Sequence, residues 1–326
     1  MAKVRVAVLC GGRSGEHEIS LRSSEAILKG LDPAKYEVSR IFISPEGRWE
    51  PGPILPEPGA NPGIDVVFPI LHGTFGEDGT VQGLLELADL AYVGPGVMAS
   101  AVAMDKDVLK RLLSERGIPV VEWATLWRGR YDVSVLAGLF PYPVFVKPAN
   151  LGSSVGISKV ARPEELDAAL QHAAQFDRKL LMERGITGRE FECSVMGNED
   201  PIAAIPCEVL PSRAFYDYED KYLLDTAKTV LPAQLEPAQT EEIRRLAVEA
   251  YRAAGCEGMS RVDFLMESAT GRLYVNEINT IPGFTSISMY PKMWEAAGVP
   301  FAALLDRLIG FALDRQRAKH ATRFTR

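Results

Sequence analysis

The sequence lacks the features of a cysteine-rich, membrane-spanning or nucleic-acid-binding protein. No run approaches the roughly 20 apolar residues that a membrane-spanning helix requires. The net charge of -7 argues against a general nucleic-acid surface, which needs a basic face. The cysteines lie far apart and include no CxxC pair, so we expect buried free thiols in place of a zinc site or a disulfide framework. These cysteines are Cys10, Cys193, Cys207 and Cys256.

Length and composition indicate a folded protein of several domains. Hydrophobic residues make up 47% of the chain and charged residues 24%, which excludes extended disorder. The 326 residues are enough for two or three domains, each with its own core. The first residues, MAKVRVAVLCGG, lack the long apolar segment and the small-residue cleavage site of a signal peptide. We therefore expect a cytoplasmic protein that binds neither nucleic acid nor membrane.

The first part of the chain alternates strand and helix patterns. VRVAVLCGG reads as a strand followed by a glycine turn, and SGEHEISLRSSEAILKGL continues as a helix. YEVSRIFIS and IDVVFPIL add buried strands. Because strands separated by helices pair in parallel, residues 1–98 are predicted to form an α/β domain with a parallel sheet.

Two further domains are predicted after this one. In residues 99–186, MASAVAMDKDVLKRLLSERG is expected to be a helix, and YPVFVKPANLGSSVGISKV a strand, a loop and a strand. Residues 187–326 end in a hairpin, RVDFLMESATGRLYVNEINTIPG, and a basic tail. For that tail, a frayed and solvated end is favoured over an interaction arm.

The hairpin carries charged and amide side chains on one face. If its turn centres on SATG, Asp263 falls opposite Glu277, and Asn279 shares their face because side chains alternate along a strand. Carboxylate and amide oxygens suit Mg²⁺, and Arg261 would neutralise a phosphoryl group or an oxyanion. A solvent-facing strand with a cross-strand ion pair is the alternative, and the spacing alone leaves both open.

A glycine- and serine-rich loop, NLGSSVG, follows a lysine at the end of an apolar strand. Backbone amides without bulky neighbours can cradle a phosphate, although such loops also connect ordinary hairpins. Lys147 favours the phosphate interpretation, because a charge at the end of an apolar run is costly unless it meets an anion. Lys106 is a candidate for a second phosphate ligand or an ordinary helix-surface lysine.

Two loops near the N-terminus could bind an amino acid. CGGRSGEHE resembles a dinucleotide turn, which would indicate a nicotinamide dehydrogenase, but it lacks the G-x-G-x-x-G pattern. Its helix N-terminus offers amides to an anion, and Glu16 could hold an ammonium group. His72, in LHGTFGEDGTVQG, is a candidate substrate contact or a structural histidine.

The segment FYDYEDKY is too polar for a core and rich in aromatic residues. It is interpreted either as a lid that excludes water from a phosphorylated intermediate or as an exposed loop packed by its own rings. Lys221 and Tyr222 lie where a lid could turn them inward.

Taken together and in this order, HGTFGEDGTVQG, VKPANLGSSVG, RVDF and NEINTIPGFTSISMYP resemble the D-alanine:D-alanine ligases of the ATP-grasp superfamily. The resemblance extends to about Leu308 and departs from the family pattern at Ser260, where Ala or Gly is expected. It implies an α/β fold, α+β in parts, with an N-terminal substrate-binding domain and two ATP-grasp domains. ATP would lie between the central and C-terminal domains.

The resemblance also implies roles for individual residues. Two Mg²⁺ or Mn²⁺ ions would be held by Asp263, Glu277 and Asn279. ATP would be bound by Lys106, Lys147, Ser153, Ser154, Glu183 and Glu190. Catalysis would depend on Glu16, Ser153, Tyr222, Arg261 and the backbone amide of Gly283. Further substrate contacts would come from His72, Lys221 and Ser288.

The implied reaction joins two D-alanine molecules through an acyl phosphate, for peptidoglycan precursor synthesis. Tyr222 favours the dipeptide product, since relatives that join D-lactate are associated with a histidine near this position. The family also suggests a homodimer. A nucleotide-binding regulator without turnover remains an alternative. The residues that argue against it are Arg261, Asp263, Glu277 and Asn279.

Overall fold

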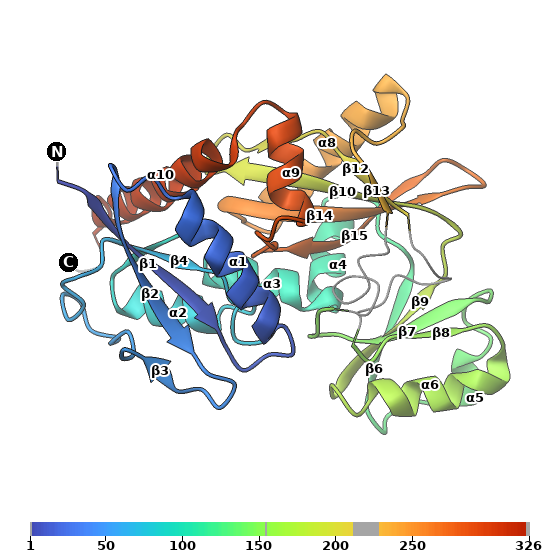
Figure 1. Ribbon diagram of the computed structural model, residues 1–326. Helices are drawn as coiled ribbons and strands as arrows, with labels where there is room; N and C mark the ends of the chain where they lie inside the picture. Colours follow the sequence, from blue (N-terminus) through green and yellow to red (C-terminus); the bar gives the residue numbers. More distant parts are fainter. Residues whose placement is uncertain (1, 154, 211–227, 324–326) are drawn as a thin grey trace.

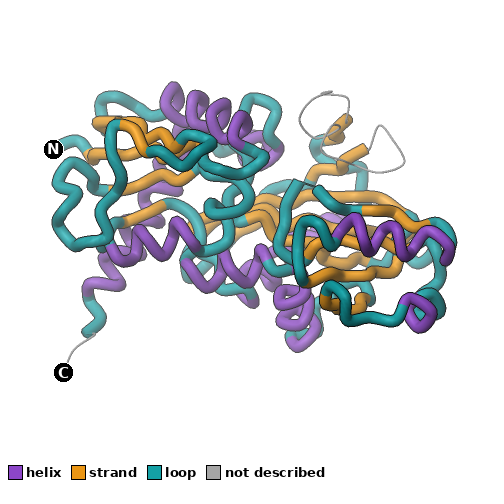
Figure 2. The backbone as a smooth tube through the Cα atoms, turned by 90° about the horizontal axis from the view of Figure 1, so that it is seen from below, coloured by secondary structure: helices purple, strands orange, loops and turns teal. Residues whose placement is uncertain are grey.

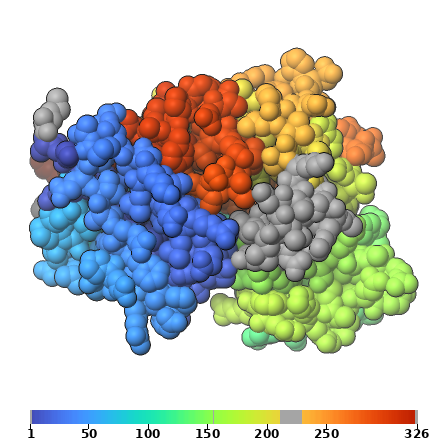
Figure 3. All heavy atoms as spheres, in the orientation of Figure 1, coloured from blue at the N-terminus to red at the C-terminus, as the bar shows by residue number. Residues whose placement is uncertain are grey.

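The computed structural model describes residues 2–153, 155–210 and 228–323, and their strands form three sheets. One sheet belongs to the N-terminal part, one to the middle of the chain and one to the C-terminal part (Figure 1). Both ends of the chain lie beside the N-terminal sheet (Figures 1 and 2). In the space-filling view, the blue N-terminal part lies directly against the red C-terminal helices (Figure 3).

The N-terminal sheet is the predicted α/β layer. Its order is β3-β2-β1-β4-β5, formed by β1 (Val4–Gly11), β2 (Tyr36–Ile43), β3 (Trp49–Glu50), β4 (Val66–Pro69) and β5 (Ala91–Tyr92). All neighbours pair in parallel except β3, which is antiparallel to β2. Alternate residues of β1 enter two cores, so that one face packs on α1 (His17–Gly30) and the other on α2 (Thr80–Leu87).

The central sheet is antiparallel, with the order β6-β9-β7-β8. Its strands are β6 (Trp123–Trp127), β7 (Val144–Pro148), β8 (Ser158–Val160) and β9 (Lys179–Arg184). The covering helices are α5 (Val133–Leu136) and α6 (Leu166–Ala173), and the short helix η1 (Pro163–Glu165) leads into α6. The long helix predicted before this sheet is instead two helices, α3 (Val97–Met104) and α4 (Lys106–Glu115), since Asp105 has an extended backbone between them.

The C-terminal sheet has the order β13-β12-β10-β14-β15, with β11 paired to β10. Its strands are β10 (Gly188–Gly197), β11 (Ile202–Ala203), β12 (Cys207–Leu210), β13 (Lys228–Val230), β14 (Gly258–Glu267) and β15 (Leu273–Asn279). The amphipathic helix α8 (Pro237–Ala253) covers one face with buried apolar residues. Val262, Phe264 and Ile278 point into that core, as the alternation predicted. The opposite face is therefore left for polar side chains.

One apolar core joins the N-terminal sheet to the C-terminal helices α9 (Met289–Ala296) and α10 (Phe301–His320). Phe68 of β4 meets Phe284 edge to face, with ring centroids 5.7 Å apart. Leu304 and Leu308 of α10 are fully buried in the same cluster. The two parts are consequently held together by burial of shared apolar surface.

The prediction of a frayed, solvated tail is wrong for residues up to 320. Helix α10 continues to His320, which lies 3.0 Å from Asp89, and Lys319 forms a 2.6 Å ion pair with Glu86. Arg315 donates to the carbonyl oxygens of Gly94 and Tyr92. The basic charges complement acidic groups and carbonyls of the N-terminal part, a match that the tail sequence alone does not reveal.

Arg315→Met is expected to destabilise the protein by about 2 kcal/mol, because it leaves two carbonyl oxygens without their donor. The guanidinium carbon also lies 4.3 Å from the centroid of the Tyr92 ring. This cation–π contact is lost in the variant, because Met carries no charge. Urea denaturation measures the change. Arg317→Met is the matched control, since Arg317 is 74% exposed. Equal denaturation midpoints for the two variants would contradict this role.

Each cysteine is a buried free thiol, as the sequence predicted. Burial raises the pKa of Cys193 and of Cys256 to about 12, so these thiols stay protonated at neutral pH. Among the described helices, none is by itself long and apolar enough to cross a membrane. Helices α9 and α10 meet the criteria of length and composition only as a pair, which is bent by 106°.

Candidate active site

A cavity of about 880 Å³ lies where the three parts of the chain meet. Its wall includes the N-terminus of α1, the glycine loop after β7, strands β10, β14 and β15, and the segment leading into α9. The predicted site residues that line it are Glu16, His72, Ser153, Arg261, Glu277, Asn279, Gly283 and Ser288. Ser154, Lys221 and Tyr222 lie outside the described residues. Folding thus brings together residues that the sequence places far apart.

Arg261 is the central cation of the polar sheet face. Its Nε and Nη2 donate to the two carboxylate oxygens of Asp263, both at 2.7 Å, and Nη2 lies 3.3 Å from Glu192 Oε1. This bidentate geometry holds the guanidinium in one orientation. Glu192 also lines the cavity and was missed in the sequence. The alternation of Glu190, Glu192 and Ser194 in REFECSV is the signal that could have found it.

The predicted oxygen ligands lie together. Asp263 pairs with Glu277 in the β14–β15 register, and a register shift follows directly after this pair. Asn279 Nδ2 donates to Asp263 Oδ2 at 2.9 Å. Two carboxylates and an amide on adjacent strands fit a hard divalent cation that takes its remaining oxygens from water and phosphate. Within the described part of the chain, no group of three or more His, Cys, Asp or Glu residues is arranged as a metal site.

Lys106 connects this face to the glycine loop. Its Nζ lies 3.5 Å from Glu277 Oε2 and donates to the carbonyl of Leu151 at 2.7 Å. Its backbone amide donates to Ala149, just after β7. The lysine is 6% exposed, so its charge is directed to these acceptors and to the space between them. An anion between the sheet face and the glycine loop would meet the ammonium group of Lys106 already in place.

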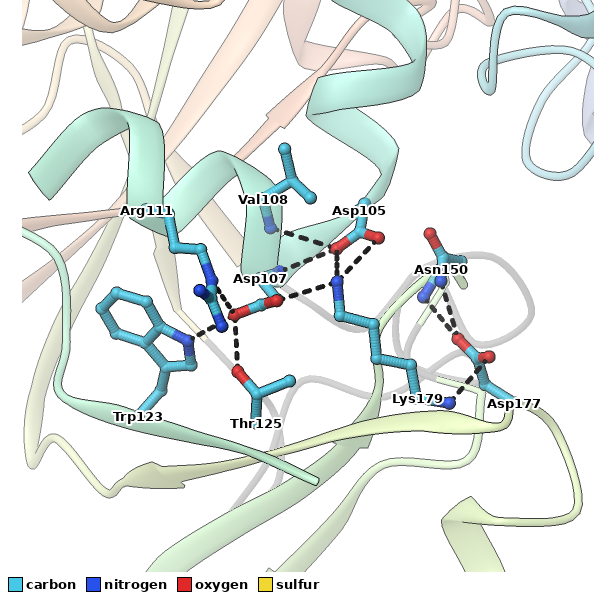
Figure 4. Close-up of polar contacts among 9 residues, drawn as sticks. All are labelled: Asp105, Asp107, Val108, Arg111, Trp123, Thr125, Asn150, Asp177 and Lys179. Atoms are coloured by element: carbon cyan, nitrogen blue, oxygen red, sulfur yellow. Dashed lines mark hydrogen bonds and ion pairs between the residues drawn. The ribbon is translucent and has the colours of Figure 1, made fainter. Parts of the chain in front are cut away.

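Helix α4 is anchored around Lys106 by a cluster of charged residues (Figure 4). Asp105 caps the helix by accepting from the amides of Asp107 and Val108, and both aspartates form ion pairs with Lys179 of β9. Asp107 also accepts from Trp123 and Thr125 of β6. The start of α4 is therefore fixed against the central sheet, which positions Lys106.

Glu16 occupies a corner made by two glycines. A methyl group at Gly73 would lie 2.6 Å from Glu16 Oε2, and one at Gly152 would lie 3.6 Å from it. Ser153, next in the loop, has a positive φ of 52°, and its buried Oγ has no hydrogen-bond partner among the described residues. The structure thus brings the predicted Glu16 carboxylate beside the glycine–serine loop of the central part.

His72 lines the cavity but bonds to protein atoms. Its Nδ1 lies 2.9 Å from the carbonyl oxygen of Ile281, and its Nε2 lies 3.4 Å from Ser23 Oγ. Burial lowers its pKa, so the ring is neutral at pH 7. Ser23 also accepts from the amide of Phe284. These contacts favour the structural interpretation of His72, as a support for the segment after β15.

Glu77 supports the same segment and was not singled out in the sequence. Its Oε2 accepts from the amide of Gly73 at 2.7 Å, and its Oε1 accepts from the amide of Ile281 at 3.1 Å. Desolvation, together with the neighbouring Glu16 carboxylate, raises the pKa of Glu77 to about 8. The glutamate within HGTFGEDG could have been recognised in the sequence as a structural residue, because a glycine-rich loop has free backbone amides to which a carboxyl group can hydrogen-bond.

The raised pKa of Glu77 predicts a pH-dependent stability. The unfolded chain ionises this group near pH 4.5, whereas the folded protein keeps it protonated up to about pH 8. Unfolding therefore releases a proton in this window, and the contribution of Glu77 to stability falls as the pH rises from about 4.5 to about 8. Glu77→Gln cannot ionise and should lose less stability over this range. Urea denaturation across it would contradict the prediction if both proteins gave parallel profiles.

Gly283 lies in close contact with Ser288 at the start of α9. A methyl group on Gly283 would lie 2.6 Å from Ser288 Oγ, which accepts from the amide of Thr285 at 3.0 Å. A side chain here would have to displace the hydroxyl that lines the same cavity. The two predicted residues are therefore neighbours, and the Ser288 hydroxyl occupies the space beside Gly283.

Gly283→Ala is expected to lower kcat about 10-fold, because the methyl group displaces Ser288 and shifts the segment by a fraction of an ångström. Steady-state kinetics measure the effect. Gly310→Ala is the control, since a methyl group on that helical glycine meets no atom within 4 Å. If Gly283→Ala matches the control in kcat, the close contact does not matter for activity.

The other predicted nucleotide residues do not line this cavity: Lys147 and Glu183 lie on the central sheet, and Glu190 lies on the C-terminal sheet. Lys147 Nζ of β7 is 2.6 Å from Glu183 Oε2 of β9, and Lys110 Nζ of α4 is 3.2 Å from Glu183 Oε1. Lys110 was missed, because a lysine in an amphipathic helix gives no sign that it is buried. Glu190 lies on β10, paired in register with Leu265.

Comparison with known proteins is consistent along the whole chain. The family model of the D-ala D-ala ligase N-terminus matches residues 5–57 and 54–95, and that of the D-ala D-ala ligase C-terminus matches residues 112–310. A D-alanine–D-alanine ligase of Solibacter usitatus is 65% identical to this chain. The alignment covers 99% of this chain and 100% of that relative.

Solved structures agree with this. The D-alanine-D-alanine ligase from Coxiella burnetii is 40% identical, with a TM-score of 0.87 over 98% of this chain and 97% of that chain. The VanG D-Ala:D-Ser ligase from Enterococcus faecalis is 36% identical, with a TM-score of 0.87, and the match covers 95% of this chain and 100% of that chain. The α/β architecture with the ATP-grasp fold is thereby confirmed. The chain belongs to the D-alanine–D-alanine ligase family.

Proposed function

We propose that the protein is an ATP-dependent ligase that joins two D-alanine molecules into D-alanyl-D-alanine, for peptidoglycan precursor synthesis. The observation that carries this function is the single cavity shared by Glu16, Arg261, Gly283 and Ser288. These residues offer a carboxylate for an ammonium group, a cation and an amide for an oxyanion, and a hydroxyl for a carboxylate. A chain 65% identical over its full length to a named ligase supports the same activity.

The reaction has two steps. The carboxylate of the first D-alanine attacks the γ-phosphorus of ATP, which forms an acyl phosphate and releases ADP. The amine of the second D-alanine then attacks the acyl carbon, loses a proton, and expels inorganic phosphate from the tetrahedral intermediate. Phosphorylation is required because oxide is a poor leaving group and phosphate is a good one. The protein contributes mainly orientation and electrostatic stabilisation.

The cavity residues have separate tasks. Glu16 binds the ammonium group of the first D-alanine, oriented through Ser153 and Tyr222. Arg261 and the amide of Gly283 stabilise the oxyanion. Lys221 with Ser288 contacts phosphate and the carboxylate of the second D-alanine. His72 completes the wall beside the first substrate.

The nucleotide lies between the central and C-terminal domains in this proposal. The domains are residues 1–98, 99–186 and 187–326. Phosphates are contacted by Lys106, Lys147 and the loop Ser153–Ser154, with Glu183 and Glu190 near adenine and ribose. Asp263, Glu277 and Asn279 hold two Mg²⁺ or Mn²⁺ ions, which when bound neutralise charge on the phosphoryl oxygens. Arg261 and Lys106 balance the carboxylates of this face from its two sides.

The ligase proposal is tested by phosphate release and product analysis. Purified protein with ATP, Mg²⁺ and D-alanine should release phosphate and form the dipeptide, whereas L-alanine should support neither. D-serine and D-lactate as second substrates test acceptor choice, since the relative from Enterococcus faecalis is named as a D-Ala:D-Ser ligase. Absence of D-alanine-dependent phosphate release would overturn the proposal.

We also propose a homodimer, as the family resemblance implies. Two apolar side chains on the adjacent helices α2 and α3 are largely exposed, Leu87 at 65% and Met98 at 66%. A second copy of the chain would remove such apolar surface from water. Light scattering should give twice the mass of one chain, and Leu87→Lys with Met98→Lys should lower it. A monomer at all concentrations would contradict this assembly.

A further inference from the structure

We propose that Lys110 is a positioning residue of the nucleotide site, holding Glu183 in place and balancing its charge while Lys147 serves a phosphate. The inference rests on the proposed function for its nucleotide. Lys110 is not among the residues assigned a role in the reaction. Lys110 lies one turn after Lys106 on α4, and its side chain is 1% exposed.

The surroundings of Lys110 explain how a lysine can be buried there. Its Nζ donates to the carbonyl of Val121 at 3.1 Å, lies 3.2 Å from Glu183 Oε1, and sits 5.6 Å from the centroid of the Trp123 ring. The ammonium group thus has a hydrogen-bond acceptor, a counter-ion and an aromatic face. Burial lowers the pKa of Lys110, and the Glu183 carboxylate opposes that effect. All of these partners are protein atoms, so this cation belongs to the interior.

Glu183 is held between two lysines. Its Oε2 lies 2.6 Å from Lys147 Nζ and its Oε1 faces Lys110, so each carboxylate oxygen has its own cation. Burial raises the pKa of Glu183, but the two ammonium groups outweigh burial and the net shift is downward. The carboxylate is therefore ionised and lies between two cations. One lysine would suffice to neutralise it.

The second cation gives the cluster an excess positive charge next to the glycine–serine loop. Lys147 ends β7, immediately before that loop, and is more exposed than Lys110, at 7%. Lys147 is thus the lysine placed to share its charge with a phosphate. Without Lys110, a phosphate and Glu183 would compete for one ammonium group, and the carboxylate would be left without full compensation. With Lys110, Glu183 keeps a counter-ion in the loaded state.

The test measures nucleotide affinity directly, without D-alanine. Calorimetric titration with Mg²⁺ and a non-hydrolysable ATP analogue compares the wild type with Lys110→Met, Glu183→Gln and the double variant. Lys110→Met should bind the nucleotide at least about 10-fold more weakly. The double variant should bind within about 3-fold of Glu183→Gln alone, because Lys110 acts through Glu183 and the two effects are not additive. Lys159→Met, an exposed lysine on β8, is the control and should bind as the wild type does.

Kinetics separate positioning from a merely structural role. Lys110→Met should raise KM for ATP while KM for D-alanine changes less than about 2-fold. Wild-type affinity in Lys110→Met, or losses that multiply in the double variant, would overturn the inference. If Lys110→Met fails to fold, the double variant compared with Glu183→Gln still decides, since neither of these variants contains the Glu183 carboxylate that Lys110 neutralises. A wild type that binds the analogue but releases no phosphate with D-alanine would overturn the ligase proposal and leave this test intact.

Discussion

Arg261→Met is expected to lower kcat for dipeptide formation by about 10³-fold, the upper part of the range for losing one oxyanion donor. The guanidinium is held by Asp263 through two 2.7 Å hydrogen bonds and approaches Glu192 at 3.3 Å. Its removal takes a cation from the cavity and leaves two carboxylates facing each other without it. Both effects oppose the build-up of negative charge in the transition state.

Steady-state phosphate release, with thermal melting of the same samples, measures this effect. Arg272→Met is the matched control, because Arg272 is an exposed arginine at the other end of the same hairpin. The variant should melt near the wild-type temperature or somewhat below it, with kcat falling far more than stability predicts. Retention of more than a tenth of wild-type kcat would remove Arg261 from the catalytic proposal.

Glu277→Gln is expected to lower kcat by about 10²-fold and to raise the Mg²⁺ concentration required for half-maximal activity. Gln keeps the shape of the side chain but replaces a carboxylate oxygen with an amide nitrogen. The partner cation Lys106, 3.5 Å away, then loses its counter-ion. Of the three predicted ligands, Asp263 is then the one that carries a negative charge, since Asn279 is neutral. The loss should be partly recovered at high Mg²⁺.

Titration of activity against Mg²⁺ and Mn²⁺ measures the change, and Glu295→Gln serves as the control. Glu295 is an exposed carboxylate on α9, away from the sheet face. If Glu277→Gln lowers kcat with an unchanged metal requirement, Glu277 acts through Lys106 and does not hold the metal.

The N-terminal part does more than form a wall for the substrate. His72, Glu77 and Ser23 each bond to the backbone between residues 281 and 284, which leads to the proposed oxyanion amide. A catalytic amide in a connecting segment needs such support, since loops without side-chain anchors are mobile. The fit between the two parts therefore determines where the amide of Gly283 points.

The hairpin was predictable in detail because its information is local. Period-two alternation placed Asp263 and Glu277 on one face and Val262 and Phe264 on the other, and the observed register agrees. The same reasoning missed Glu192, which lies on the neighbouring strand β10. The pairing of β10 with β14 cannot be read from the sequence of either strand. Sequence patterns describe faces within an element, whereas pairing between distant elements depends on the whole fold.

The helical segment before the central sheet is a second place where the sequence alone did not predict the structure fully. Its amphipathic spacing predicted a helix, but neither the break at Asp105 nor the burial of Lys110 could be inferred. Both depend on the central sheet, whose Lys179 pairs with Asp105 and whose Glu183 receives Lys110. The error about the C-terminal tail has the same origin, since the acidic partners of Lys319 and His320 lie in the N-terminal part.

By itself, the sequence determined the strand and helix types, the inward and outward faces, and a set of motifs specific enough to indicate the family. These depend on residue chemistry at short spacing, which the chain carries wherever it folds. The tertiary structure alone decided which charges neutralise one another, which amides are clamped, and which lysine is buried. Such pairings follow from the packing of sheets and helices that are distant in sequence, and a buried charge is tolerated only where that packing supplies its partner.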